Sequence, residues 1–341
     1  MRVNSRVGSF PVFFVLCGLL LVALTLEVSL GPIGISPGKI ISATLAYFQG
    51  SRGADAVVMG AIRWPRALVA ALVGGSLAAT GAVLQAIFRN PMADPGIIGV
   101  SSGGSLGAVA VIQLGWSQAG IWVTPVAAFL TGLLTVWVIY RLATVQGRTA
   151  LYALLLAGVA LGSLASALMS LLLSLAPLET MQQILFWLMG GLDDSSWPVA
   201  GILAGVTLVG GGFYFWLAPA LDVLSLGEEQ AEGVGVSLQR MKQLALFASA
   251  MVVGTCVSAT GVIGFVGLIV PHLLRHWVGP SHRRLLPASA LGGASLLLLA
   301  DVVGRMALQP VEINVGIVTS CLGAPFFLYL LRRRTTGTQG G

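Results

Sequence analysis

Residues 63–107 read RWPRALVAALVGGSLAATGAVLQAIFRNPMADPGIIGVSSGGSLG, and this part of the chain is the most informative about its architecture. Two arginines at its start, Arg63 and Arg66, are followed by an apolar segment that carries no charge before Arg89. The polar segment NPMADP at 90–95 then places two prolines where they prevent a continuous helix. We therefore expect two closely packed helices at membrane depth, joined by a broken polar turn.

The composition is that of a membrane protein. The chain of 341 residues is 56% hydrophobic and 9% charged, with a mean hydropathy of +0.93. Soluble domains carry about 25% charged residues, so the lipid bilayer is the expected surrounding of this chain. Its net charge of +6 comes from basic residues spread over the loops rather than gathered on one face, which gives no support to a nucleic-acid partner.

Charge-free stretches indicate how many helices cross the membrane. A spanning helix needs about 20 apolar residues, which predicts an all-α integral membrane fold with ten transmembrane helices in a single domain, 1–341. The ten predicted spans lie near residues 10–30, 64–88, 97–114, 120–140, 150–175, 197–217, 241–260, 262–275, 285–306 and 312–331. An even number of spans places both termini on the same side of the membrane.

The basic residues predict which side that is. Cytoplasmic loops carry an excess of Lys and Arg, and placing both termini in the cytoplasm puts 13 of the 18 basic residues inside. The remaining five, on the outside, are Lys39, Arg52, Arg63, Arg66 and Arg305. We therefore expect the N and C termini to be cytoplasmic.

Two connecting segments, one on each side of the membrane, stand out in the sequence. Residues 180–192 are amphipathic and contain Trp187, which predicts a short helix lying at the outer, periplasmic interface. Residues 218–239 form the longest inner segment and hold four of the twelve acidic residues.

Small residues recur on one face of the helix that follows the break. Gly99, Gly103 and Gly107 are spaced by four residues. Since helices in lipid have no hydrophobic drive to associate, such faces let their backbones approach closely. The pattern predicts tight helix packing, with a moving helix pair as the alternative.

The motifs of an enzyme are missing. Gly38-Lys39 is followed by Ile40 and lacks the upstream glycine of a phosphate-binding loop, so the chain is not expected to hydrolyse ATP. No metal-ligand cluster or nucleophile motif occurs, so we expect neither a catalytic residue nor a metal site.

An ion-coupled secondary carrier is the alternative class. Such carriers place ionisable groups at mid-membrane. The candidates here are Asp301 and Arg305, which are spaced as an ordinary ion pair on one helix. They lie near the outer end of the ninth predicted span, so they offer little support for a proton relay.

Eight ordered blocks resemble the permease family of ABC importers for iron chelates, haem and vitamin B12. The first four are RWPR at 63–66, GAVLQAIFRNPMADPGIIGVSSG at 81–103, LLLAGVALG at 154–162 and FWLMGGL at 186–192. The others are LSLGEEQAEGVGV at 224–236, GVIGFVGLIVPHLLRHWVGPSHRRLLP at 261–287, ADVVGR at 300–305 and VGIVTSCLGAPFFLYLLRR at 315–333. The resemblance covers nearly the whole chain after the first span.

The resemblance implies an assembly in the bacterial inner membrane. Two copies of the chain would form the translocation path as a homodimer, powered by two cytoplasmic ATPase subunits that bind ATP and Mg²⁺. A periplasmic substrate-binding protein would deliver the cargo. This chain itself would hold no cofactor.

Three groups of residues match functional positions of the family. Arg63, Arg66 and Arg305 match arginines that dock acidic residues of the binding protein; exposed guanidinium groups suit carboxylates, and snorkelling arginines are the alternative. The segment 218–239 matches the coupling helices that contact the ATPase, through Leu226, Gly227, Glu228, Ala231 and Gly235. Asn90, Met92, Leu151 and Tyr152 match the cytoplasmic gates.

The cargo is expected from the character of the fifth span, 150–175, which lines the path in the family. The segment is aliphatic and offers no polar cluster for hydroxamate or catecholate groups, so we expect haem. A ferric siderophore or vitamin B12 is the alternative within the same class.

Overall fold

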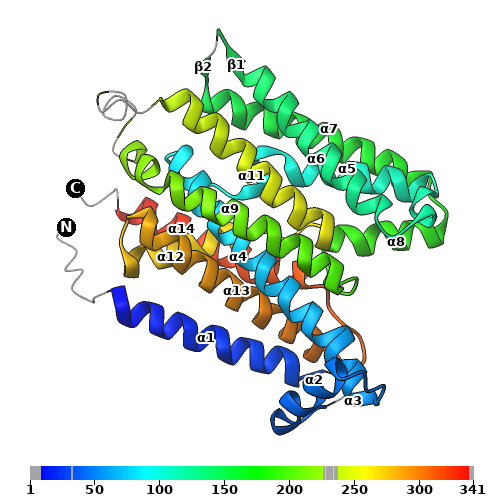
Figure 1. Cartoon of the computed structure of the whole chain (residues 1–341). Helices are drawn as coiled ribbons and strands as arrows, with labels where there is room; N and C mark the ends of the chain where they lie inside the picture. Colours follow the sequence, from blue (N-terminus) through cyan, green and yellow to red (C-terminus); the bar gives the residue numbers. More distant parts are fainter. Residues whose placement is uncertain are drawn as a thin grey trace.

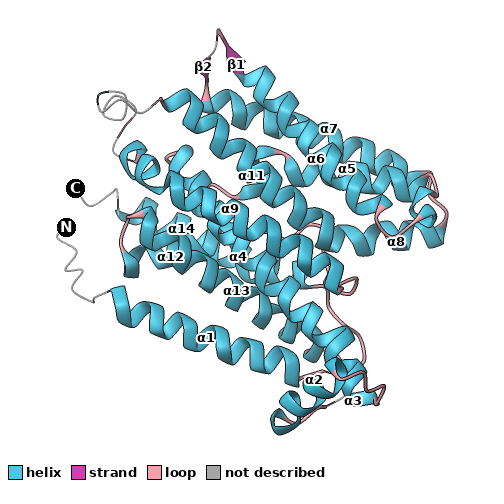
Figure 2. Ribbon diagram, in the orientation of Figure 1, coloured by secondary structure: helices cyan, strands magenta, loops and turns pink. Residues whose placement is uncertain are grey.

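Most of the described residues are helical in the computed structural model, which covers residues 9–31, 34–146, 148–225, 227, 233 and 237–337 (Figures 1 and 2). The long helices are α1 (Ser9–Ser29), α4 (Trp64–Ile87), α5 (Val100–Gln113), α6 (Val123–Ala143), α7 (Leu151–Ser174), α9 (Trp197–Leu224), α11 (Leu238–Thr260), α12 (Val266–Val278), α13 (His282–Met306) and α14 (Val315–Gly337). The shorter α-helices are α2 (Ile40–Phe48), α3 (Ala54–Val57) and α8 (Leu178–Met189).

The remaining elements are single turns and one hairpin. The turns are η1 (Pro37–Lys39), η2 (Val58–Arg63), η3 (Pro95–Ile98) and η4 (Trp116–Ala119). η2 is a π-helical turn that continues directly into α4. Strands β1 (Thr144–Val145) and β2 (Arg148–Thr149) pair antiparallel between α6 and α7, and they form the single sheet among the described residues.

Every predicted span contains a helix, which confirms an all-α membrane fold. Within the described residues, seven helical segments are long and apolar enough to cross a membrane: α1, the continuous segment Ala54–Ile87 that ends with α4, α6, α7, α9, α11 and α13. Helices α5, α12 and α14 occupy the three other spans and are shorter in their apolar part. The exact number of ten crossings therefore stays a prediction.

Helix α4 forms the centre of the molecule. Residues 73–87 are all buried, and α13, α9, α12 and α11 pack around them. Small residues make this possible: a Cβ added at Gly74 would lie 2.3 Å from the carbonyl oxygen of Gly293 on α13, and one at Gly81 would lie 1.9 Å from that of Gly267 on α12. A helix that is apolar on every side is buried on every side.

The elements separate to two ends of the helix bundle. In Figure 1, the start of α1 and the end of α14 lie at the left and the β1–β2 hairpin lies at the top, whereas α8 lies at the right and α2 and α3 lie at the lower right. We call these the inner end and the outer end, after the orientation predicted from the loop charges. The interfacial helix expected at 180–192 is α8, Leu178–Met189, and it lies at the outer end.

The polar break between α4 and α5 is confirmed. The side chain of Asp94 accepts a hydrogen bond from the Gly96 N–H at 2.8 Å and caps η3. Gly99 then adopts a left-handed conformation with φ of +79°, which glycine tolerates best, and α5 begins at Val100.

Helix α9 extends seven residues beyond the predicted end of the sixth span at residue 217. α9 continues to Leu224 through Pro219, because Leu217, Ala218 and Leu221 are buried and hold this part of the helix in the core. The first seven residues of the segment expected to form coupling helices, 218–239, therefore belong to α9.

Most of the predicted coupling residues lie outside the described residues, namely Leu226, Glu228, Ala231 and Gly235. Gly227 is described: its N–H donates to the carbonyl oxygen of Leu224 at 3.1 Å. The role of this segment stays a prediction.

Candidate functional site

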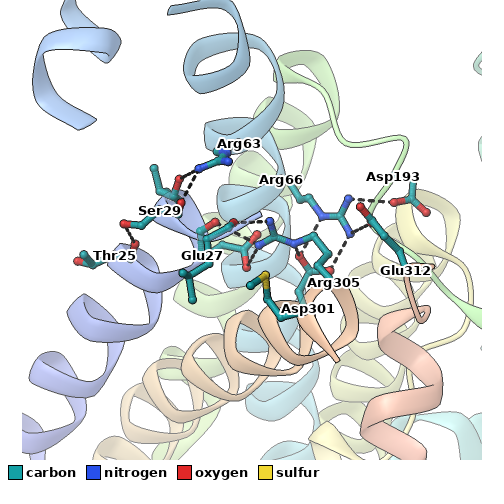
Figure 3. Close-up of polar contacts among 12 residues, drawn as sticks. Thr25, Glu27, Ser29, Arg63, Arg66, Asp193, Asp301, Arg305 and Glu312 are labelled. Atoms are coloured by element: carbon teal, nitrogen blue, oxygen red, sulfur yellow. Dashed lines mark hydrogen bonds and ion pairs between the residues drawn. The ribbon is translucent and has the colours of Figure 1, made fainter. Parts of the chain in front are cut away.

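The three arginines predicted to dock a partner lie together at the outer end (Figure 3). Arg63 ends η2 and Arg66 lies in the first turn of α4, so both come from one continuous helical segment. Arg305 lies in the last turn of α13, which packs against α4 along its length. The fold thus brings Arg305 next to two arginines that lie more than two hundred residues earlier in the chain.

Two of these arginines cap helix α1. Arg63 Nη1 donates to the carbonyl oxygens of Val28 at 2.5 Å and Ser29 at 2.8 Å. Arg305 donates to the carbonyl oxygens of Glu27 at 3.1 Å and Leu30 at 2.8 Å. The last carbonyls of a helix have no partner within the helix, and positive charge at this end is favourable.

The expected exposure is wrong for Arg63 and Arg305. Each is only 5% exposed, because the end of α1 has no basic residue of its own and draws its donors from η2 and α13. Their docking role stays a prediction, and the structure assigns them a structural task.

Asp301 forms hydrogen bonds with two of the three arginines. It accepts hydrogen bonds from Arg66 Nε and Nη2 at 2.9 and 3.0 Å, and from Arg305 Nε at 2.9 Å. The contact with Arg66 is a two-point pairing, which is among the stronger charge-assisted hydrogen bonds. Asp301 and Arg305 are the ion pair expected from their spacing on one helix. Glu27 of α1 completes the buried part at 2.6 Å from Arg305 Nη2.

Arg66 connects this buried part with the surface. Its side chain is 15% exposed and reaches Asp193 at 2.9 Å and Glu312 at 3.3 Å. These two acids are 65% and 38% exposed and belong to the loops before α9 and before α14. Figure 3 shows Arg66 between Asp301 on one side and these acids on the other.

Four carboxylates therefore surround three guanidinium groups, which leaves a formal charge of −1 on the cluster. Sequence reasoning identified the cations and missed the acids Glu27, Asp193 and Glu312 as their partners. A signal was present for Glu27, since a single acid in an apolar span requires a partner. No sequence spacing connects the two loop acids to Arg66, because their approach depends on the tertiary fold.

The predicted gate residues lie in two segments next to the ends of helices. Asn90 follows α4, and its side-chain oxygen accepts a hydrogen bond from the Met92 N–H at 3.0 Å. Leu151 and Tyr152 begin α7 directly after the hairpin, and Tyr152 is 71% exposed. Their gating role stays a prediction, because a gate requires the second copy.

The three glycines of the predicted packing face lie against α6. They oppose residues with the same four-residue spacing, Thr135 and Ile139 for Gly99, Thr135 for Gly103 and Thr131 for Gly107. At Gly107 an added Cβ would lie 2.0 Å from Thr131 Oγ1, so the contact leaves no room for a side chain. Close backbone approach is the direct consequence.

The paired histidines of α12 take part in local packing. His276 Nδ1 lies 3.0 Å from the carbonyl oxygen of His272, and the two rings are 5.4 Å apart. In the described part of the chain, no group of three or more His, Cys, Asp or Glu side chains is arranged to hold a metal ion.

Comparison with known proteins identifies the family. The profile of the FecCD transport family matches residues 19–333. The cobalamin import system permease protein BtuC of Halobacterium salinarum is 48% identical over 82% of this chain and 74% of its own. The vitamin B12 import system permease protein BtuC of Salmonella typhi is 38% identical over 92% of each chain.

A solved structure agrees with these relatives. It is described as an inward-facing conformation of a metal-chelate type ABC transporter, and it superposes with a TM-score of 0.82 at 32% identity. The match covers 95% of this chain and 99% of the other. This chain is accordingly a multi-pass inner-membrane permease subunit of an ABC importer, and it belongs to the FecCD transport family.

Proposed function

We propose that this chain carries vitamin B12 or a related corrinoid across the membrane in an ATP-driven importer. The observation that carries the proposal is the 48% identity with a permease named for cobalamin import, extending over 82% of this chain. The expectation of haem from the fifth span has no comparable support, because an aliphatic path suits any large apolar cargo. A corrinoid therefore replaces haem as the favoured cargo.

The translocation path is proposed to lie between two copies of the chain, along α7. In the most apolar part of α7, 17% of the residues are buried, whereas 78% are buried in the corresponding part of the segment that ends with α4. Leu156, Leu164 and Leu171 are each more than half exposed. An apolar, uncharged surface of this length supports a path that holds its cargo weakly enough to release it.

The partners are proposed from the two ends of the molecule. A periplasmic binding protein would dock on the outer end at Arg66, the most accessible of the three clustered arginines. Two ATPase subunits, with their ATP and Mg²⁺, would contact the inner end at residues 226–235. This chain supplies the path and its motion, and the partner subunits supply the hydrolysis.

Transport by the complete assembly tests the cargo. The chain is reconstituted in proteoliposomes with its ATPase and its binding protein, and uptake of labelled cobalamin, haem and a ferric siderophore is measured separately. ATP-dependent uptake of cobalamin, lost when the catalytic glutamate of the ATPase is replaced, is the expected result. Uptake of haem or the siderophore in place of cobalamin would overturn the proposed cargo and leave the importer class intact.

A further inference from the structure

A deep groove opens between α6 and α9 at the outer end of the molecule. Its floor is the last part of α11, which contacts both neighbouring helices. The first turns of α6 and α9 form its walls, and the end of α8 with the loop that follows closes its outer end. The volume is about 890 Å³, within the size range of small-molecule sites. No residue of α7 lines it, so it is separate from the proposed translocation path.

The groove reaches about as deep as one leaflet of a bilayer. Its wall on α9 runs from Ser196 to Val206, and nine residues of helix beyond Trp197 correspond to roughly 14 Å at about 1.5 Å per residue. The hydrocarbon core of a bilayer is about 30 Å thick. The groove therefore extends from the ends of the helices to about the middle of the membrane and stops there.

The interior of the groove has apolar walls, and its floor offers no free hydrogen-bond donor to an occupant. Phe129, Leu203 and Val206 supply apolar walls. The floor contains three hydroxyls, but each donates to a backbone carbonyl oxygen: Thr255 to that of Met251 at 2.8 Å, Ser258 to that of Thr255 at 2.9 Å and Thr260 to that of Cys256 at 3.0 Å. Because all three donors are satisfied within α11, the interior fits a hydrocarbon chain rather than a polar ligand.

The mouth of the groove is polar and acidic. Trp122 and Trp187 line it at the outer end, where such side chains favour the boundary between lipid and water. Asp193 and Asp194 lie at the same end, and none of the described residues that line the groove is a lysine, an arginine or a histidine. Both are exposed, but Asp193 is already paired with Arg66, whereas no ion pair involves Asp194 among the described residues. The mouth therefore favours a cationic group that can donate hydrogen bonds.

We propose that this groove binds one phospholipid of the outer leaflet whose headgroup carries a primary ammonium. An acyl chain lies over α11 between α6 and α9, and the ammonium group donates to the carboxylate of Asp194. A purely anionic headgroup would meet a carboxylate without a neighbouring cation from the lining, and a quaternary ammonium has no N–H to donate. Length, apolar lining and charge thus select one lipid class. The inference is independent of the proposed cargo.

Native mass spectrometry of the purified full chain tests the site. The protein is delipidated and exposed separately to phosphatidylethanolamine, phosphatidylcholine and phosphatidylglycerol, and the lipids retained per chain are counted. We expect one retained phosphatidylethanolamine, held about tenfold more tightly than either other lipid. Equal retention of the three lipids by the unmodified chain would overturn the proposal, since it indicates ordinary surrounding lipid.

Matched variants locate the lipid. Ile202→Trp on α9 fills the groove and should abolish the retained lipid, whereas Leu208→Trp, also exposed on α9 but outside the lining, should not. Met251→Trp on the floor is a second groove-filling variant, in case the first lowers the yield of folded protein. Retention of phosphatidylethanolamine by both folded groove variants at the level of the unmodified chain would overturn the site.

The headgroup contact has its own pair of variants. Asp194→Asn should remove the preference for phosphatidylethanolamine over phosphatidylcholine. Asp55→Asn changes the charge of another exposed acid at the outer end that does not line the groove, and it should keep the preference. An unchanged preference in Asp194→Asn would overturn the assignment of the ammonium group.

Discussion

At the scale of single residues, Arg66 divides its guanidinium group between a buried partner and two exposed partners. Its pairing with Asp301 lies within the protein, where it is shielded from competing solvent and salt. Its contacts with Asp193 and Glu312 lie at the surface, where an ion pair contributes roughly 0.2–1 kcal/mol. An acidic partner that docks on Arg66 must therefore displace carboxylates of the chain itself.

This competition predicts that Asp193→Asn increases the affinity of the periplasmic binding protein for this chain. The substitution releases one exposed partner of Arg66, so the affinity should rise by up to about fivefold, given the roughly 0.2–1 kcal/mol of an exposed pair. Surface plasmon resonance on the chain in phosphatidylcholine nanodiscs measures the change. Asp194→Asn removes the same charge one residue away without a contact to Arg66, so equal tightening by both variants would contradict the displacement.

At the scale of helices, glycine sets the distance between α5 and α6. Gly103 and Gly107 face Thr135 and Thr131, and neither glycine has space for a methyl group. The two helices also join the broken turn after α4 to the hairpin before α7. A change in their spacing therefore reaches both segments that hold the predicted gate residues.

Gly107→Ala should destabilise the chain by about 1–3 kcal/mol, the usual cost of overpacking. The three atoms nearest to the added methyl group all belong to the side chain of Thr131, so Thr131→Gly in the same chain should recover part of the loss. Gly205→Ala on α9 has open space around it and should leave stability unchanged or raise it. Thermal unfolding in detergent compares the four proteins, and a loss of stability in Gly205→Ala similar to that in Gly107→Ala would contradict the packing argument.

Helix positions could be predicted from the sequence where the determining signal is local. The break at 90–95 follows from Pro91 and Pro95, and the interfacial helix follows from its own amphipathic pattern. The length of α9 could not be predicted, because Pro219 suggests an end that burial of its neighbours overrides. The capping of α1 by Arg63 was equally hidden, because donor and acceptor lie on different helices.

At the scale of the whole molecule, the two ends differ in the groups that they present. The outer end carries the cluster of ion pairs, α8 and the mouth of the groove, whereas the inner end carries the hairpin and the start of α1. The direction of this arrangement in the cell rests on the excess of basic residues in the loops of the inner end. It decides which partner protein each end can meet.

Labelling of introduced cysteines tests the orientation. In a chain whose three native cysteines are replaced, Asp55→Cys on α3 should react with a membrane-impermeant maleimide in intact spheroplasts. Arg148→Cys in the hairpin should react only in inverted membrane vesicles. Both side chains replaced are exposed, so the reverse pattern of labelling would show that the chain is inserted the other way round.

The ion pair between α1 and α13 has a consequence for the order in which the protein is assembled in the membrane. Glu27 enters the membrane with the first helix, whereas its ion-pair partner Arg305 follows 278 residues later. At about 5–20 residues per second, the ribosome needs roughly 14 to 56 s to make the intervening chain. An unpaired carboxylate is costly in lipid, so the outer end closes only after α13 has been inserted. A nascent chain that stops earlier carries an acidic first helix without its cation, a mark by which cellular quality control can distinguish it from the finished protein.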